Sequence, residues 1–430
     1  MDTNSRREAM EYDVVIIGAG PAGLSTSIKL KQLNENLNVC IVEKASEVGA
    51  HILSGNVLET RALDELLPDW KNMDGCPLTT KVTKEKLIYL FQKSSFTVPS
   101  FLLPPVQHNK GNYIASLANV CRWLGQIAEN LGVEIYPGFA ASEVLYHEDG
   151  SIKGVATNDM GIDINGAKKD SFESGIELHA KVTVFSEGCR GHLGKQIISK
   201  FNLDENSDPQ QYGIGLKEIW EVPEENHDEG LVFHTVGWPV DNQTYGGSFV
   251  YHAENRQIFI GYVLGLDYSN PYMSPFEEFQ RFKTHPKISE MLKGGKRISY
   301  GARALIEGGI QSLPRMYMPG GLLIGCDAGT LNMPKIKGTH TAMKSGMLAA
   351  ETINEFIQEN LKDLSNYETK FNASWLRDEL HSARNVKPFF TNFGTLIAIL
   401  LTGIDQWLFR GKLPFTLKHK HADHETLKPA

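Results

Sequence analysis

The length and charge of the chain limit what it can be. It has 430 residues, 41% of them hydrophobic, and a formal net charge of -8 at pH 7. A chain well above roughly 250–300 residues is expected to fold as two or three domains. The acidic balance argues against nucleic acid as a partner, because phosphate binding needs clustered Lys and Arg.

The cysteines and the N-terminus exclude further classes. Residues 1–11 lack the apolar core of a signal peptide, and their acids argue against a transit peptide. No run of about 18 uninterrupted apolar residues occurs, so no membrane-spanning helix is predicted. We expect free thiols in a reducing compartment and no metal site, because no C-x-x-C pair occurs among Cys40, Cys76, Cys121, Cys189 and Cys326.

A dinucleotide-binding unit is predicted at the start of the chain. A β-branched run from Tyr12 to Ile17 predicts a buried strand, a helical pattern runs from about Leu24 to Leu33, and a second strand, Val39 to Val42, ends at Glu43. The turn before the helix would bring backbone amides to a pyrophosphate. Its candidate residues are Gly18 for the tight bend, Gly20 for close approach of the pyrophosphate, Ala22, and Gly23 for helix–strand packing.

The acid at the end of the second strand indicates the type of nucleotide. Glu43 would accept hydrogen bonds from the adenosine ribose hydroxyls and would disfavour a 2′-phosphate, so NADP is not expected here. Lys44 follows it and is a further candidate contact. A glycine turn without a ligand is the alternative, but strand, turn, helix, strand and acid all occur in order.

A distant segment indicates FAD rather than NAD. Residues 320–329 form an apolar strand that ends in Gly-x-Asp-Ala-Gly, which resembles the strand that glutathione-reductase-like flavoproteins place near the ribityl chain. Asp327 would accept a hydrogen bond from a ribityl hydroxyl or lie near the pyrophosphate, with Gly325 and Ala328 in the same turn. An ordinary buried strand with a turn aspartate is the alternative.

The segment that follows is predicted to be a helix from about Thr339 to Phe356. Its N-terminal amides would face the pyrimidine end of the flavin. This adds Lys337, Gly338 and Thr339 to the candidate cofactor site.

A third strand is predicted at Val182 to Phe185, before another glycine-rich turn. In related flavoproteins such a strand returns the chain to the FAD domain. Glu187, Gly188 and Arg190 are therefore candidates for contacts near the cofactor. A surface ion pair is the alternative.

The middle of the chain reads as an antiparallel sheet with helices. Strands are predicted at Gln211–Val222, Gly246–Tyr251 and Gln257–Leu264, the last two as a hairpin or meander, and an amphipathic helix at Leu117–Leu131. Gly246 and Gly247 would let a flat ring approach the backbone closely, although a bulge or turn explains a glycine pair equally well.

The fold class that follows is α/β with an α+β middle domain. A glutathione-reductase-like, doubly wound FAD-binding domain is expected from residues 1–90, 140–200 and 315–360, and a substrate domain on an antiparallel sheet from 91–139 and 205–314. Residues 361–430 are expected to form a C-terminal helical segment.

Two apolar segments look misplaced for a soluble enzyme. Proline interrupts the first, at 96–105, and the second, at 388–409, has an unbroken apolar part, Leu396–Leu401, much shorter than a membrane span. A helix lying in one leaflet fits the second segment, and a buried core helix is the alternative. The candidate membrane contacts are Phe101, Leu102, Leu103, Phe393, Leu400, Leu401, Trp407 and Phe409.

Over nearly its whole length the chain resembles the electron transfer flavoprotein–ubiquinone oxidoreductase family. The resemblance rests on residues 14–25, on 245–252 (YGGSFVYH), on 301–309 (GARALIEGG), on 325–340 (GCDAGTLNMPKIKGTH) and on the C-terminal segment 412–430. The 325–340 segment is far more specific than any glycine motif.

The resemblance implies a function and a location. Electrons would pass one at a time from reduced electron transfer flavoprotein, loaded by acyl-CoA and related dehydrogenases, to FAD and then to ubiquinone. Gly246 and Gly247 would hold the quinone ring, and the two apolar segments would dip into one leaflet of a membrane. We expect the cytoplasmic side of a bacterial membrane, with the matrix side of the mitochondrial inner membrane as the alternative.

One departure from the family pattern concerns the iron–sulfur cluster. The family carries a C-terminal [4Fe–4S] domain with four cysteine ligands, and none of the five cysteines here has suitable spacing. Either the chain is a fragment or a ferredoxin-like partner carries the cluster.

Two other functions remain open at the level of sequence. One is a geranylgeranyl-reductase-like FAD enzyme, and the other is a non-catalytic flavoprotein scaffold. A cytosolic aromatic hydroxylase is a weaker rival, because no docking surface for NADPH is identified. No catalytic residue is assigned, because flavin supplies the redox chemistry of quinone reduction.

Overall fold

A computed structural model describes residues 7–53 and 55–429. Its first sheet has the order β19-β20-β13-β1-β2-β8, and β1 (Ala9–Ile17) pairs in parallel with both β2 (Val39–Glu43) and β13 (Glu177–Phe185). Helix α1 (Pro21–Leu33) connects β1 to β2. The predicted strand–helix–strand unit is therefore confirmed, and the carboxyl ends of these strands meet at one edge, where ligands bind in such sheets.

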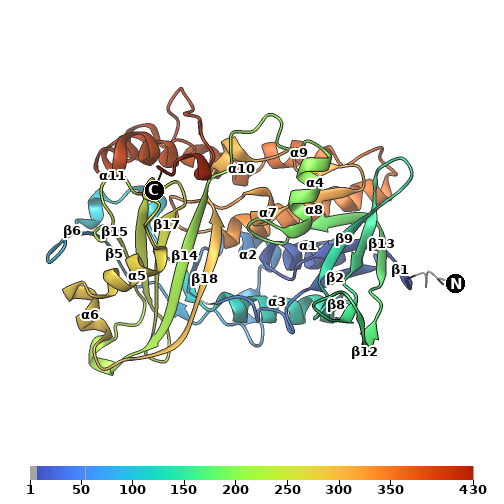
Figure 1. The fold of residues 1–430 in the computed structure, drawn as a ribbon, viewed down its shortest axis with the longest axis horizontal. Coiled ribbons are helices and arrows are strands. Elements are labelled where there is room, and N and C mark those ends of the chain that lie inside the picture. The colour runs from blue at the N-terminus through green and yellow to red at the C-terminus, as the bar shows by residue number, and fades with distance from the viewer. Residues whose placement is uncertain (1–6, 54, 430) are drawn as a thin grey trace.

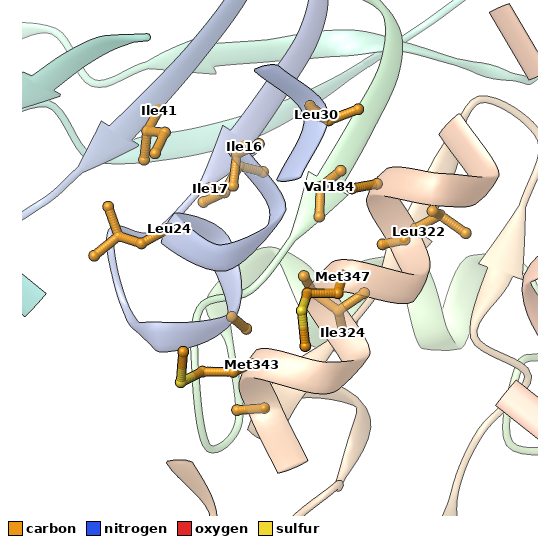
Figure 2. Close-up of a cluster of buried hydrophobic side chains, with 14 of the residues drawn as sticks. Ile16, Ile17, Leu24, Leu30, Ile41, Val184, Leu322, Ile324, Met343 and Met347 are labelled. Atoms are coloured by element: carbon orange, nitrogen blue, oxygen red, sulfur yellow. The ribbon is translucent and has the colours of Figure 1, made fainter. Parts of the chain in front are cut away.

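The core of this domain lies between the sheet and the helices (Figure 1). Helix α1 packs against α3 (Leu117–Asn130) and α8 (Thr339–Gln358). Figure 2 shows side chains from β1, α1, β2, β13 and α8 that meet in this core. Each fully buried side chain of this size contributes roughly 1.5–3 kcal/mol to folding; those labelled include Ile16, Leu24, Ile41, Val184 and Met347.

The second sheet has the order β18-β14-β17-β16-β15-β5-β6. Its pairs are antiparallel except β5 with β15, which are parallel. The bounds are β5 Lys84–Leu90, β6 Ser95–Val98, β14 Tyr212–Glu221, β15 Leu231–Gly237, β16 Gly246–His252, β17 Gln257–Gly265 and β18 Lys296–Ile306. The predicted strands of the middle region and the β16–β17 pairing are thus confirmed.

The two faces of the second sheet have different neighbours. Residues such as Tyr262 and Leu264 pack with Phe279 and Phe282, so that α5 (Pro275–Lys283) covers the outer face together with α6 (Pro286–Leu292). The other face, called here the inner face, looks toward the first domain. A Cβ added at Gly55 would contact Phe249 and Phe259 on it.

Strand pairing does not follow the expected domain boundaries. Strand β5 lies within 1–90, yet it pairs with β15 of the second sheet. Helix α3 and β8 (Glu134–Pro137) lie within 91–139, yet α3 packs on α1 and β8 pairs with β2 of the first sheet. The chain therefore crosses between the two sheets more often than the expected domain boundaries allow. Each strand pairs with a neighbour that satisfies its backbone hydrogen bonds, and the sequence pattern does not specify that neighbour.

The remaining elements are short. A three-stranded sheet joins β3 to β7 and β4, and β9 and β10 extend the first sheet at β13. Their bounds are β3 Asn56–Leu58, β4 Thr80–Lys81, β7 Tyr113–Ala115, β9 Ala141–Tyr146, β10 Ile152–Thr157, β11 Met160–Ile162, β12 Lys168–Glu173, β19 Tyr317–Met318, β20 Gly321–Leu323, α2 Arg61–Leu66, α4 His192–Lys200 and α7 Gly325–Ala328.

The C-terminal helices are α9 (Asn366–Asn372), α10 (Trp375–Ala383) and α11 (Val386–Ile404). By length and composition alone, the stretch Trp375–Phe409 could cross a membrane, and 39% of its most apolar window is buried. Gly394 interrupts α11 with a φ of 72° and a ψ of 168°. Each half of α11 is therefore far shorter than the roughly 20 residues of a span.

Candidate cofactor and quinone site

The turn between β1 and α1 requires glycine at two positions for steric reasons, and at a third glycine position the space around the backbone is free. Gly18 has a φ of 99°, and a Cβ there would lie 2.7 Å from the carbonyl oxygen of Ser186. A Cβ on Gly23 would overlap the carbonyl oxygen of Gly18. Among the described residues, no atom lies within 4 Å of a Cβ built on Gly20, and Gly20 caps α1 without any side-chain hydrogen bond. The backbone at Gly20 therefore faces open space at a bare helix N-terminus.

Glu43 closes one side of this turn. Its Oε2 accepts a hydrogen bond of 2.9 Å from the backbone nitrogen of Ala19, and its Oε1 accepts one of 2.8 Å from that of Ala45. Lys44, also a candidate, is exposed. The carboxylate thus sits at the carboxyl ends of the central strands, beside the glycine-rich turn.

Asp327 lies in α7 and is buried beneath α4. Its carboxylate accepts hydrogen bonds from the backbone nitrogens of Glu187, at 3.1 Å, and Gly191, at 3.2 Å. A Cβ on Gly191 would come within 2.5 Å of Asp327 Oδ1. Burial, together with the nearby Glu187 carboxylate, raises the pKa of Asp327 to about 8. In the absence of ligand this carboxyl therefore carries a proton over much of the neutral range.

Glu187 has a structural role that the sequence did not reveal. Its carboxylate accepts hydrogen bonds from the backbone nitrogens of His192, Leu193 and Gly194, which are the free donors of the first turn of α4. Arg190 has a φ of 55°, and its guanidinium lies 5.4 Å from the ring of Tyr212. Within residues 7–53 and 55–429 neither Glu187 nor Arg190 forms an ion pair, so the surface-pair alternative is wrong.

The two predicted flavin turns are brought together. A Cβ on Gly325 would lie 2.8 Å from the Cβ of Ala22, so the turn before α7 contacts the start of α1. Ala328 is fully buried, and Thr339 begins α8 behind Gly338, which has no side-chain cap. Two bare helix N-termini, those of α1 and α8, thus belong to the same domain.

The loop before α8 is held by a partly buried ion network. Lys335 Nζ lies 2.8 Å from Glu59 Oε2 and 2.9 Å from Glu379 Oε2. His340 Nε2 lies 2.7 Å from Glu379 Oε1. Lys337 is buried beside this network, its ammonium donates to the carbonyl oxygen of Lys335, and burial lowers its pKa to about 8. The sequence gives no periodic signal for these partners, which are far apart along the chain.

The inner face of the second sheet opposes the first domain. Strand register places Gly247, Phe249, Lys217 and Arg303 on this face. A Cβ on Gly188 would lie 3.3 Å from Arg303 Nη2, so the two domains meet at that loop. No ion pair of Lys217 or Arg303 occurs within the described residues. Neither cation was a candidate from the sequence.

The glycine pair fits tightly into the sheet. A Cβ on Gly246 would lie 3.0 Å from the carbonyl oxygen of Val263, and one on Gly247 would lie 2.6 Å from that of Thr235. Cross-strand packing alone therefore requires glycine at 247.

The chain has strong resemblance to curated proteins over almost its full length. It is 54% identical to "Electron transfer flavoprotein-ubiquinone oxidoreductase" of Pseudomonas aeruginosa over 99% of this chain and 78% of that protein. It is also 54% identical to the mitochondrial protein of the same name from Bos taurus, over 99% of this chain and 71% of that protein.

The chain belongs to the electron transfer flavoprotein-ubiquinone oxidoreductase family. The profile described as "ETF-QO, ubiquinone-binding" matches residues 212–305, which include Gly246, Gly247 and most of the second sheet. The profile described as "Pyridine nucleotide-disulphide oxidoreductase" matches residues 12–109, which include the glycine-rich turn. The expected family and fold class are confirmed.

Solved structures show the same fold at low identity. A geranylgeranyl bacteriochlorophyll reductase-like protein from Thermoplasma acidophilum superposes with a TM-score of 0.69, at 17% identity over 93% of this chain and 97% of that one. The flavin-dependent brominase Bmp2 superposes with a TM-score of 0.64, also at 17% identity, over 93% and 90% of the two chains. These likenesses concern the fold alone.

The geometry of this family member fits an FAD molecule. The open space at Gly20 and the uncapped N-terminus of α1 suit a pyrophosphate, because backbone N–H groups and the helix dipole favour an anion there. The uncapped N-terminus of α8 offers a second set of donors. Glu43 and Asp327 provide acceptors for hydroxyl groups from opposite sides of the turn.

The predicted membrane contacts are at least partly exposed, with one exception. Phe101 is 74% exposed and Leu400 is 64% exposed, whereas Leu103 is only 2% exposed and belongs to the core. Leu103 was wrongly included because apolar character alone does not tell which face of a short turn is buried. The other predicted contacts are Leu102, Phe393, Trp407 and Phe409, which are exposed, and Leu401, which is partly buried.

Contacts join the two apolar segments, far apart in sequence. Trp407 Nε1 donates a hydrogen bond of 3.2 Å to the carbonyl oxygen of Leu102. Figure 1 shows α11 beside β5 and β6 at the same end of the molecule. Asp405, which would be costly in lipid, is buried in the protein instead. We call the exposed set the apolar platform; it consists of Phe101, Leu102, Phe393, Leu396, Ile397, Leu400, Ile404, Trp407, Leu408 and Phe409.

Proposed function

We propose that this protein binds FAD and passes electrons from reduced electron transfer flavoprotein to ubiquinone. The observation that carries the proposal is the 54% identity, over 99% of the chain, to proteins named for that reaction. The match of residues 212–305 to a ubiquinone-binding profile supports a quinone as the acceptor.

The chain's own residues have distinct tasks in this scheme. The turn at Gly18, Gly20 and Gly23 would hold the pyrophosphate, Glu43 the adenosine ribose, and Asp327 the ribityl chain. When bound, FAD supplies the ability to accept and release electrons singly or in pairs. The protein orients the ring between the two domains and keeps water from it.

The acceptor would bind between the domains at Gly246 and Gly247, the second of which lies on the inner face. A flat quinone ring can approach a backbone without side chains, and the N–H groups there can bind its carbonyl oxygens. Lys217 and Arg303 on the same face would bring positive charge close to the ring system, which favours the reduced, more negative forms of both molecules.

We further propose that the apolar platform lies in one leaflet of a membrane. A long isoprenoid tail cannot leave the bilayer at low cost, so its reductase must meet the lipid. The break of α11 at Gly394 and the burial of Asp405 fit a helix that lies in the interface. The relatives include a bacterial protein and a mitochondrial one. We propose the cytoplasmic side of a bacterial membrane, with the matrix side of the mitochondrial inner membrane as the alternative.

The five cysteines support the proposal that these 430 residues hold no iron–sulfur cluster. All five are free, and burial raises the pKa of Cys121 and of Cys189 to about 12. Thiolates are needed as cluster ligands, and two such thiols resist ionisation. Iron and sulfide analysis should find less than one iron per chain; about four would contradict the proposal.

Stopped-flow absorbance tests the central proposal. The FAD-loaded protein is reduced with electron transfer flavoprotein or dithionite and mixed with a short-chain ubiquinone. We expect the flavin absorbance to return as the quinone is consumed. A reduced flavin that no quinone reoxidises would overturn the assignment, and prenyl double-bond loss with a prenylated substrate would replace it by reductase chemistry.

A further inference from the structure

A buried charge cluster lies beside the glycine pair at one end of the second sheet. Lys387 Nζ, on α11, lies 3.2 Å from Asp267 Oδ1 and 3.5 Å from Glu307 Oε2. The side chains of all three residues are less than 10% exposed. Removing two carboxylates and one ammonium from water costs free energy, because one negative charge has no positive partner. A proton on one of the carboxylates lowers this cost.

The backbone is arranged to bring this cluster together. A Cβ on Gly265 would lie 2.5 Å from Asp267 Oδ1, 2.8 Å from Lys387 Nζ and 3.0 Å from Tyr245 Cδ1. A Cβ on Gly213, its partner in the β14–β17 register, would lie 2.5 Å from Glu307 Oε1. Two paired glycines thus clear the space that the charged groups occupy.

The cluster contacts the proposed quinone site through Tyr245. Lys387 Nζ lies 4.2 Å from the centre of the Tyr245 ring, and Tyr245 directly precedes Gly246. The hydroxyl of Tyr245 lies 2.8 Å from the sulfur of Met333. Both Met333 and Glu307 line a cavity of about 10 Å³, which has room for about one water molecule.

Glu307 is the group in this cluster with unused hydrogen-bonding capacity. Among the described residues none forms a hydrogen bond with its Oε2, and the Lys387 ammonium lies 3.5 Å from that oxygen. Burial raises the pKa of Glu307 to about 7, although Lys387 opposes the shift. Burial alone would lower the pKa of Lys387, but Asp267 and Glu307 raise it, so Lys387 keeps its charge.

The other groups that face the cluster do not change this assignment. Asp423 Oδ2 accepts a hydrogen bond of 2.8 Å from the backbone nitrogen of Tyr212, and burial raises the pKa of Asp423 to about 6. His419 Nε2 lies 2.8 Å from the carbonyl oxygen of Gly308, and burial lowers the pKa of His419. Arg384 lines the same cavity.

We propose that Glu307 delivers a proton, through one water molecule and the Tyr245 hydroxyl, to the quinone bound at Gly246 and Gly247. This inference rests on the proposed function. The quinone takes two electrons from the flavin and two protons to become quinol. Glu307 gives one proton for each O–H bond formed, becomes a carboxylate beside Lys387, and regains a proton from solvent on the Asp423 side. Lys387 and Asp267 act as positioning residues.

Glu307→Gln tests this step, because glutamine keeps the shape but cannot release a proton. Quinone-dependent flavin reoxidation in the FAD-loaded variant is followed from pH 5.5 to pH 9. In the wild-type protein we expect the rate to fall as pH rises past about 7; in the variant it should be roughly 10²-fold slower at pH 6 and nearly independent of pH. Reduction of the flavin by its donor should not change.

Glu218→Gln is the matched control. Glu218 is a buried glutamate of β14 on the outer face, where it pairs with Lys283 and Arg297. Its loss should leave the pH profile of reoxidation intact, even if it lowers stability. Glu307→Asp, which keeps a titratable group, should restore a pH-dependent rate with an altered midpoint, and it serves as the test if the glutamine variant does not fold.

The outcomes separate the two proposals. If wild-type protein does not reduce quinone, the proposed function fails. If it does, and Glu307→Gln keeps the wild-type rate and pH profile, the proton-delivery role is overturned. A Glu307→Asp variant whose reoxidation rate does not depend on pH would overturn it as well. An equal loss of rate at all pH values in Glu307→Gln and Glu218→Gln would also overturn it, because that result indicates a structural role.

Discussion

The carboxylate of Glu43 accepts a hydrogen bond of 2.9 Å from the backbone nitrogen of Ala19. This bond joins the end of β2 to the turn that leads into α1. The residue that the sequence marks as a ribose acceptor therefore also holds the shape of the phosphate-binding turn. Cofactor binding and local stability are coupled through one side chain.

Replacing Glu43 with alanine should weaken both properties. The backbone nitrogens of Ala19 and Ala45 lose their acceptor, which costs roughly 1–3 kcal/mol of unfolding free energy. We expect FAD affinity to fall by about tenfold or more, measured by flavin fluorescence titration. Glu35→Ala, at an exposed position, is the control. Normal affinity with lowered stability would assign Glu43 a structural role only.

Alanine at Gly20 and alanine at Gly23 should affect different properties, FAD affinity in the first case and folding stability in the second. Space is free around Gly20, so Gly20→Ala should change the stability of the FAD-free protein by less than about 1 kcal/mol while lowering FAD affinity. Gly23→Ala overlaps the Gly18 carbonyl and should cost roughly 1–3 kcal/mol. Urea unfolding and flavin titration measure both. Unchanged FAD binding in Gly20→Ala would place the pyrophosphate elsewhere.

The buried carboxyl of Asp327 should make the stability of the FAD-free protein depend on pH. Its pKa is raised to about 8 in the folded state from 3.8, so its contribution is complete below about pH 4 and is lost as pH rises through about 8. Stability should therefore decline across this range, and Asp327→Asn should flatten the decline. Urea midpoints at pH 5 and pH 8 test this, with Asp170→Asn as the exposed control. An equal slope in both variants would contradict the assignment.

A charge on the apolar platform should release the protein from membranes. Leu400 is 64% exposed, and transferring its side chain into lipid is worth roughly 1.5–3 kcal/mol. Leu400→Glu should therefore lower binding to anionic vesicles by at least about tenfold in a flotation assay. Ile164→Glu changes a fully exposed isoleucine between β11 and β12, away from α11 (Figure 1), and should have no effect. Equal binding of both variants would show that the platform does not meet lipid.

Local pattern was sufficient for the elements that carry the cofactor signal. The run from Tyr12 to Ile17, the turn at Gly18 and the acid Glu43 fall in β1, the α1 turn and β2 as predicted. Strand and helix periods and the steric needs of glycine are properties of neighbouring residues, so they are readable along the chain. The β16–β17 pairing is readable for the same reason.

Only the tertiary structure decided which sheets β5 and β8 join and that Leu103 is buried. It also decided the meeting of Lys387, Asp267 and Glu307. The sequence by itself determined the family, the dinucleotide unit and the apolar character of two segments. Partners that are far apart along the chain leave no periodic trace, because strand pairing and the desolvation of charge depend on which surfaces meet in the folded chain.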